Sequence, residues 1–215
     1  MAENTFETQY DLTKKNKIIK FYEDNKVFIY SSLIILLIVF GSTAYYFENK
    51  ENNKILLSEN YIQAKINLEA GKEGEALNEL KELIFANDPT YSTLSLYLIL
   101  DYNLIEDEKE IISLYNHILK NNKYDKEFKN LLIYKKALFS SNFSLESELL
   151  ETTKTLINSD SLWKPHALLL LGDFFMSKGE NIKAIEFYQQ ILLTKNLHRD
   201  LYTKAKSQLD FIANE

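Results

Sequence analysis

The sequence predicts an all-α protein with a single membrane-spanning helix near its N-terminus and a helical domain after it. Three observations predict this class. A run of 21 residues without charge, Val27 to Phe47, lies between Lys26 and Glu48. Beyond this run, apolar residues recur at intervals of three and four, without the sustained alternation that is typical of strands. Glycine, proline and asparagine then divide the chain into segments of about 12 to 16 residues, the length of ordinary globular helices.

The uncharged run has the length and the residue pattern of a membrane-spanning helix. At about 1.5 Å per residue it extends about 31 Å, which matches the ~30 Å hydrocarbon core of a bilayer. Aromatic rings that favour the headgroup layer lie near its two ends, at Tyr30, Tyr45 and Tyr46. The remaining polar residues are small, and we expect their hydroxyls to bond to the helix backbone: Ser31, Ser32, Ser42 and Thr43.

Lysines flank the run unevenly and favour a cytoplasmic N-terminus. Five of them lie in residues 1–26, and three lie in the 20 residues after Phe47. Because positive charges close to a span favour the cytoplasmic side, residues 1–26 are expected to be a short cytoplasmic segment and residues 27–47 the transmembrane helix. Residues 48–215 then form a domain on the other side. In a bacterium this is a periplasmic domain anchored in the inner membrane.

A cleaved signal peptide is the alternative interpretation of the same run. The stretch Ser42-Thr43-Ala44 has the small residues that a cleavage site requires. The apolar run is longer than a usual signal-peptide core, however, and the segment before it is long and contains Glu23 and Asp24. These features favour a retained anchor.

Charge and cysteine content exclude several classes of function for the domain. The formal net charge of -6 belongs wholly to residues 48–215, because the first 26 residues are neutral and the span is uncharged. An acidic domain without a basic stripe argues against nucleic acid as a partner. The chain contains no cysteine, so neither disulfides nor thiolate metal sites are available.

The domain contains a degenerate repeat of about 35 residues, whose clearest unit begins at Pro165. Its positions 4, 7, 8, 11, 15, 20 and 24 carry the residue types of the tetratricopeptide pattern: Leu168, Leu171, Gly172, Phe175, Gly179, Ala184 and Tyr188. Small residues at positions 8 and 20 let the two helices of a unit cross closely. Aromatic residues at positions 11 and 24 fill the space beside the crossing, and the glycine at position 15 supplies the turn.

Earlier units keep this pattern with weaker residues. The first has Ala64, Gly71, Ala76 and Leu80 at positions 8, 15, 20 and 24, and the second has Ile111, Tyr115 and Ile118 at positions 20, 24 and 27. Leu149 takes position 20 of a third unit, so the position-20 residues are spaced by 35, 38 and 35. The sequence therefore predicts a tetratricopeptide-like α-solenoid of about four helix pairs; an unrelated helical bundle is the alternative.

The last helix is expected over His198 to Ala213 and is interpreted as a cap. Four apolar positions are expected to lie on its inner face: Tyr202, Ala205, Leu209 and Ile212. Its other face is polar, which suits a terminal repeat that must stay soluble.

Known catalytic patterns are absent from the sequence. The chain has no phosphate-binding loop, no H-E-x-x-H pair and no G-x-S-x-G elbow. His117, His166 and His198 stand on different expected helices without a partner that would indicate a metal. The acidic run Glu106-Asp107-Glu108 is interpreted as a solvated first turn of a helix, with a calcium site as the weaker alternative. We therefore expect a non-enzymatic protein with no cofactor, no metal and no small-molecule substrate.

Binding to other proteins is the remaining function. Stacked helix pairs present a concave face that is lined mostly by the first helix of each pair. On this arrangement the groove residues are Tyr61, Lys65 and Leu68 from the first unit, and Leu169, Asp173 and Met176 from the last. Each of these residues is also suited to packing between repeats.

The whole chain resembles the YfgM-type family of bacterial inner-membrane proteins, which are ancillary subunits of the SecYEG translocon. Four stretches carry the resemblance: Ile18 to Lys26, Ala64 to Ala76, Asp88 to Tyr91, and Trp163 to Ile191. The middle units contain more Tyr, Ile and Asn than the family pattern.

The resemblance implies a cytoplasmic segment, one span and a periplasmic tetratricopeptide-like domain. It implies association with the translocon and with a membrane-anchored periplasmic chaperone of the prolyl isomerase class, in support of newly exported chains. A scaffold of another envelope complex, such as outer-membrane assembly or cell division, would have the same architecture. The two cannot be distinguished by the fold, because a repeat fold does not determine which ligand it binds. An enzyme with a cryptic site and a eukaryotic organelle adaptor are further alternatives.

Overall fold

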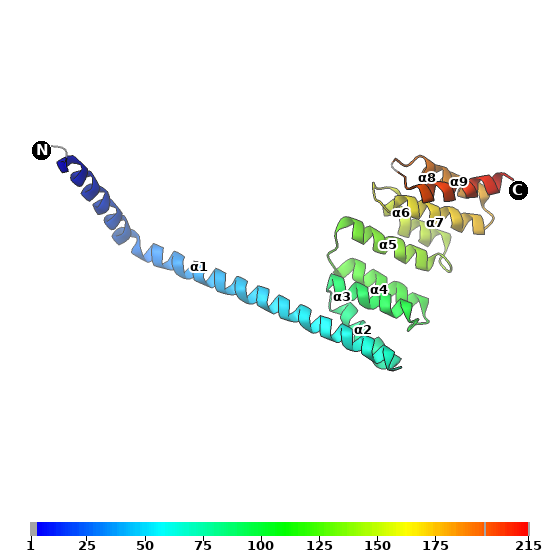
Figure 1. Cartoon of the computed structure of the whole chain (residues 1–215), viewed down its shortest axis with the longest axis horizontal. Helices are drawn as coiled ribbons and strands as arrows, with labels where there is room; N and C mark the ends of the chain where they lie inside the picture. The colour runs from blue at the N-terminus through cyan, green and yellow to red at the C-terminus, as the bar shows by residue number, and fades with distance from the viewer. Residues whose placement is uncertain (1–3, 196, 215) are drawn as a thin grey trace. The chain divides into compact units, whose positions relative to one another are not determined.

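The structure, a computed structural model, describes residues 4–195 and 197–214, with side chains from residue 19 onward. In this part of the chain there are nine helices and no strands, which confirms the predicted all-α class (Figure 1). The helices are α1 (Asn4–Glu69), α2 (Glu73–Phe85), α3 (Pro89–Asp101), α4 (Glu108–Asn121), α5 (Lys126–Ser140), α6 (Glu146–Ile157), α7 (Lys164–Ser177), α8 (Asn181–Leu192) and α9 (Arg199–Ala213). The chain divides into two compact units, Met1–Leu56 and Leu57–Glu215.

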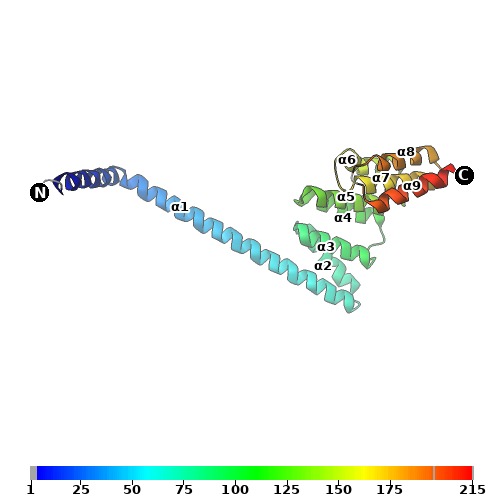
Figure 2. The same ribbon diagram turned by 45° about the horizontal axis from the view of Figure 1, so that its top comes forward.

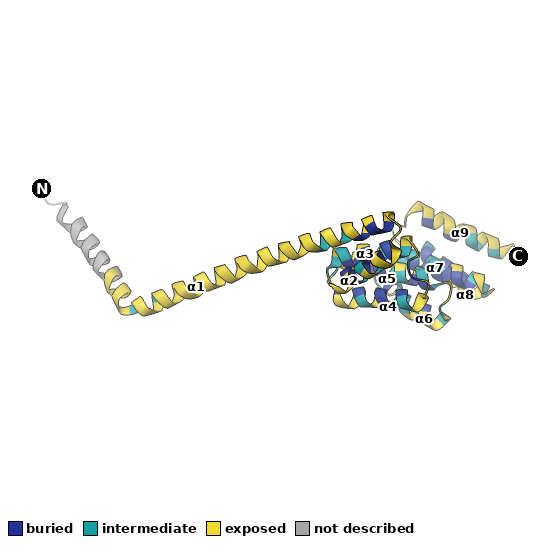
Figure 3. Ribbon diagram, turned by 90° about the horizontal axis from the view of Figure 1, so that it is seen from below, coloured by how far each residue is buried: buried dark blue, intermediate teal, exposed yellow. Residues whose placement is uncertain are grey.

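The first unit consists of the larger part of α1. The helix is long and apolar enough, by length and composition, to cross a membrane, and none of its most apolar window is buried (Figure 3). Three hydroxyls bond to backbone carbonyls as predicted: Ser31 Oγ donates to Phe28 O at 2.9 Å, Ser42 Oγ to Ile38 O at 2.7 Å, and Thr43 Oγ1 to Phe40 O at 2.9 Å. No such bond is found for Ser32 among the described side chains.

Helix α1 continues through the polar residues 48–54, which are exposed, and ends at Glu69. The apolar run and residues 57–69, the first helical segment of the second unit, therefore belong to one unbroken helix. Of the expected cytoplasmic segment, residues 4–26 are helical, and residues 1–3 lie outside the described part.

In the second unit, each of the helices α2 to α9 packs against the next one in the chain. Three further contacts join helices two apart, α2 with α4, α5 with α7, and α7 with α9. The order of helices in space thus follows their order in sequence, as both ribbon views show (Figure 1, Figure 2).

Most of the helix ends lie at or near glycine, proline or asparagine residues, which were predicted to divide the chain into helices. Gly71 and Gly179 both have φ of 74°, a left-handed conformation that favours glycine, and they follow α1 and α7. Asp88 caps α3 by accepting from Thr90 N at 2.9 Å and Tyr91 N at 3.0 Å, with Pro89 as the first helical residue. Gly74 is an exception, because it lies inside α2 and breaks nothing.

Two hydrophobic cores fill the second unit, and they divide within α5. Leu132 belongs to the first core and Ala137 to the second. The residues at position 20 of the sequence repeat are all buried, on α2, α4, α6 and α8: Ala76, Ile111, Leu149 and Ala184. Ala64, Leu80, Tyr115, Ile118, Leu168, Leu171, Phe175 and Tyr188 are buried as well.

The inner face of α9 differs from the prediction at one position. Tyr202 is 46% exposed, and the neighbouring Leu201 is buried at 8%. Ala205 is buried, and Leu209 and Ile212 pack against the second core as expected. The prediction for Tyr202 is therefore wrong, because α9 packs on α7 and α8 with its face turned so that Leu201, one position earlier, is buried instead.

Candidate functional site

Helices α7 and α8 cross closely at Gly172 and Tyr188. A Cβ atom on Gly172 would lie 2.5 Å from Cε1 of Tyr188 and 2.8 Å from Cδ1. The ring is fully buried, and its hydroxyl donates to Asp173 Oδ1 at 2.7 Å. Burial, and then the bond to Asp173, raise the pKa of Tyr188 far above its usual range. Asp173, an expected groove residue, thus helps to hold the core tyrosine.

The other expected groove residues of the last unit take part in packing. Leu169 and Met176 are both half-buried and pack against the second core. Met176 Sδ lies 3.8 Å from the Tyr188 hydroxyl. Asp173 is exposed, so it is the residue of this set with the most surface open to a partner.

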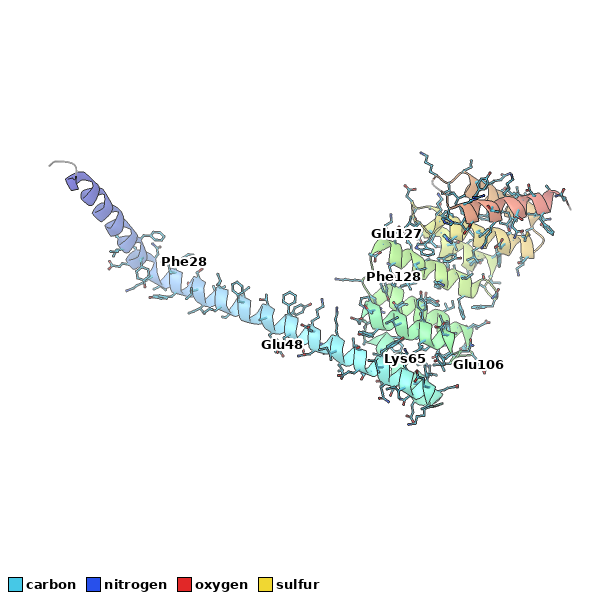
Figure 4. The ribbon with its side chains drawn as sticks, viewed as in Figure 1. Phe28, Glu48, Lys65, Glu106, Glu127 and Phe128 are labelled. Carbon is cyan, nitrogen blue, oxygen red and sulfur yellow. The ribbon has the colours of Figure 1, made fainter. Side chains whose placement is uncertain are left out.

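The three groove residues expected near the end of α1 differ in exposure. Leu68 is buried. Tyr61 is half-buried, and its ring lies 6.2 Å from that of Tyr91 on α3. Lys65, labelled in Figure 4, is exposed. Only Lys65 of this set is therefore free of the core.

A cavity of about 630 Å³ lies elsewhere, between α3, α4 and α5. None of the six expected groove residues lines it. Its apolar wall comes from the end of α3, the start of α4, the loop between them and the end of α5: Ile99, Leu100, Ile105, Ile111, Leu138 and Phe139. Polar side chains stand around it: Asn103, Glu106, Glu108 and Lys135. Apart from its acidic run, this cavity was not predictable from the sequence, because the lining residues come from three helices and the α3–α4 loop and share no motif.

The position of the cavity follows from how α5 is held. At its start, Glu127 Oε2 accepts from Ser161 Oγ at 3.0 Å and from Leu162 N at 3.1 Å, in the loop before α7. Asn130 Nδ2 adds a bond to Ser161 Oγ at 2.9 Å. These bonds tie the start of α5 to the C-terminal half of the domain. Glu106 lies on the opposite side of the domain from Glu127 (Figure 4).

Helix α3 is held to the α4–α5 loop at its start, where Thr93 Oγ1 and the Tyr124 hydroxyl lie 2.9 Å apart. Helix α4 packs against both α3 and α5, but α3 and α5 are not a packed pair in the described part of the domain. Their C-terminal ends therefore stand apart over α4, and the cavity occupies this space.

The Tyr115 side chain lines the cavity from α4 and is only 2% exposed. Its hydroxyl has no hydrogen-bond partner among the described residues, and burial raises the pKa of this tyrosine far above its usual range. It therefore remains a neutral hydroxyl that is able to donate and to accept.

The acidic run at the start of α4 has the predicted structure. Asp107 caps the helix by accepting from Lys109 N at 2.9 Å, and Glu108 is its first helical residue. Glu106 and Glu108 are exposed. Neither of them, nor Lys135, is in an ion pair within the described structure.

The three histidines occupy separate places. His117 Nε2 lies 2.9 Å from Asn87 Oδ1, and His198 precedes α9 as its N-terminal cap. His166 packs with Trp163 and Tyr134, its ring centroid 5.1 Å from that of Trp163, and burial lowers the pKa of its imidazole. From residue 19 onward, no group of three metal-ligating side chains comes together in the described structure.

Comparison of the chain with protein-family models, with curated proteins and with solved structures finds no match.

Proposed function

We propose that this protein is a membrane-anchored scaffold that binds other proteins through its helical domain. One observation carries the proposal: a single helix, α1, contains both 21 uncharged residues, Val27 to Phe47, and the first helical segment of a packed domain. The leucine, isoleucine and phenylalanine side chains of this run are exposed. Such a surface is stable in lipid and unfavourable in water.

We propose that the domain is a tetratricopeptide-like solenoid. Its pairs are residues 57–69 with α2, α3 with α4, α5 with α6, and α7 with α8, and α9 is the cap. Two features support this arrangement. The position-20 residues, one on the second helix of each pair, are all buried. Each of the helices α2 to α9 also contacts the next one in the chain, and α5 with α7 and α7 with α9 make contact two places apart. Solenoids of this kind commonly serve as binding surfaces.

A role beside the Sec translocon is the most specific form of the proposal. It rests on the resemblance to the YfgM-type family, with the N-terminus in the cytoplasm and the domain in the periplasm of a bacterium. Its partners are then the SecYEG-type translocon and a periplasmic prolyl-isomerase-type chaperone. Tethering to the membrane raises the local concentration of the domain at the exit site, so that weak contacts suffice.

We propose a non-enzymatic role. Each histidine has a structural position: His117 bonds to Asn87, His198 caps α9, and His166 packs in an aromatic cluster. The acidic charge of residues 48–215 supports protein partners over nucleic acid.

The absence of cysteine allows a direct test of the orientation. A single cysteine at Asn53, which is exposed after the span, is expected to react with a membrane-impermeant maleimide in cells with a permeabilised outer membrane. A single cysteine at Glu23, exposed before the span, is expected to react only after the inner membrane is broken. Acidic residues influence topology little, so this change leaves the lysine bias intact.

The parent chain, which contains no cysteine, is the control for background labelling in this experiment. The reverse pattern, with labelling at position 23 in cells whose inner membrane is intact, contradicts a periplasmic domain.

The partner proposal is tested by crosslinking in living cells, mild solubilisation and affinity purification of the full-length protein. We expect translocon subunits and a periplasmic prolyl-isomerase-type chaperone to be enriched. Enrichment of outer-membrane assembly or cell-division proteins instead would reject the Sec proposal and support the alternative scaffold. A chain in which residues 27–47 alone are joined to an unrelated soluble domain controls for capture through the membrane helix.

A further inference from the structure

We infer that the cavity between α3, α4 and α5 is a docking site for a short peptide segment that carries an apolar side chain next to a lysine or arginine. This inference rests on the proposed function, since it specifies where the scaffold holds a protein partner. It also places the site away from the groove residues that the repeat pattern suggests.

The apolar wall of the cavity accounts for the apolar side chain of the peptide. Its volume of about 630 Å³ lies within the range of 300–1,000 Å³ that is typical of ligand sites. Leu138 is 41% exposed there, although it lies beside the buried Ile111 and Tyr115. An inserted leucine, isoleucine or phenylalanine side chain would remove this surface from water.

The charges around the cavity account for the basic residue. Glu106 and Glu108 are exposed at the start of α4, and neither forms an ion pair in the described structure. Lys135 is the cation among the lining residues, so the acidic side chains outnumber it. A lysine or arginine beside the apolar anchor would meet two unpaired carboxylates, which favours a basic partner over an acidic one.

The Tyr115 hydroxyl favours a peptide over a lipid chain. The Tyr115 side chain is 2% exposed and is one of the residues that line the cavity, and its hydroxyl forms no hydrogen bond within the described part of the chain. An extended peptide carries backbone N–H and C=O groups that can bond to it. An acyl chain offers neither a hydrogen bond to Tyr115 nor a positive charge to Glu106 and Glu108.

The test is a selection of displayed random peptides of about 12 residues against the full-length protein in nanodiscs, after depletion on empty nanodiscs. We expect the enriched peptides to carry leucine, isoleucine or phenylalanine within two positions of a lysine or arginine. Fluorescence anisotropy with one labelled enriched peptide then measures affinity for protein variants.

Leu138→Asn is expected to weaken binding at least tenfold. The matched control is Ile182→Asn on α8, at a side chain that is 78% exposed and outside the cavity lining, and it is expected to leave affinity within twofold of the parent. The double variant Glu106→Lys with Glu108→Lys is expected to weaken binding similarly. A peptide whose lysines are replaced by glutamates should bind this double variant better than the parent protein, which a merely unfolded variant cannot do.

Two results would overturn the inference. One is a selection that yields no peptide above the empty-nanodisc background, and the other is an enriched peptide that binds the Leu138→Asn variant as well as the parent. Co-purification of partners is measured separately. Failure of the peptide experiment together with intact co-purification rejects the cavity as a docking site and leaves the proposed scaffold function in place. Failure of both experiments rejects the proposed function.

Discussion

Replacing Gly172 with alanine is expected to lower the free energy of unfolding of the second core by about 1–3 kcal/mol, the usual cost of overpacking. The new Cβ would lie 2.5 Å from Cε1 of Tyr188. The ring has little room to move, because it is fully buried and its hydroxyl is bonded to Asp173. Urea unfolding of the full-length protein in detergent measures the change, followed by the fluorescence of Trp163, the single tryptophan, which stacks on Tyr134.

Gly74→Ala is the matched control for this prediction. An added Cβ at Gly74 meets no atom within 4 Å, and alanine in a helix is favoured over glycine by about 0.5–1 kcal/mol. We therefore expect Gly74→Ala to be neutral or slightly stabilising. In a Tyr188→Leu background, Gly172→Ala should cost much less than in the parent, because the ring is gone. Equal stability of the parent and Gly172→Ala would show that the α7–α8 crossing is looser than described.

Placing two lysines at the centre of the uncharged run is expected to abolish membrane integration. The double variant Leu36→Lys with Leu37→Lys puts two charges where each costs about 2.5–3.5 kcal/mol on the insertion scale. Both leucines are exposed in the structure, so the change disturbs no core. Carbonate extraction of membranes is the measurement, and the variant is expected in the soluble fraction.

The same substitutions at Ile55 and Leu56 serve as the control. These side chains are also exposed on α1, but they follow the polar residues 48–54 and lie outside the run. We expect this control to remain in the membrane pellet. Retention of the Leu36/Leu37 variant in the pellet would instead mean that the run is not what anchors the protein.

The fold class and most helix ends were predictable because their signals are local. The 21-residue run needs only its length and lack of charge, and Asp88-Pro89 supplies a cap and a first helical residue within two positions. Gly71 and Gly179 mark turns because glycine tolerates positive φ. Gly74, which has no such constraint, lies inside α2 although glycine was expected to separate helices.

Which face of a helix is buried was predictable only in part. The buried positions on α2, α4, α6 and α8 were predicted correctly because they recur at nearly constant spacing, and each was expected to pack in the same way. On α9 the periodicity allowed both Leu201 and Tyr202, which are adjacent and apolar, and contact with α7 and α8 selected Leu201. Periodicity defines an apolar stripe to within about one position, and the neighbouring helices set the rest.

By itself the sequence determined the uncharged helix, the all-α class, most helix ends and the small residues at the α7–α8 crossing, since each depends on neighbours within a few turns. Only the tertiary structure decided that α3 and α5 do not form a packed pair, and that Glu106, Leu138 and Tyr115 surround one cavity. The physical reason is that the spacing of two helices over a third depends on every side-chain volume between them and on ties such as that of Glu127 to Ser161. Such long-range contacts leave no periodic trace in the sequence.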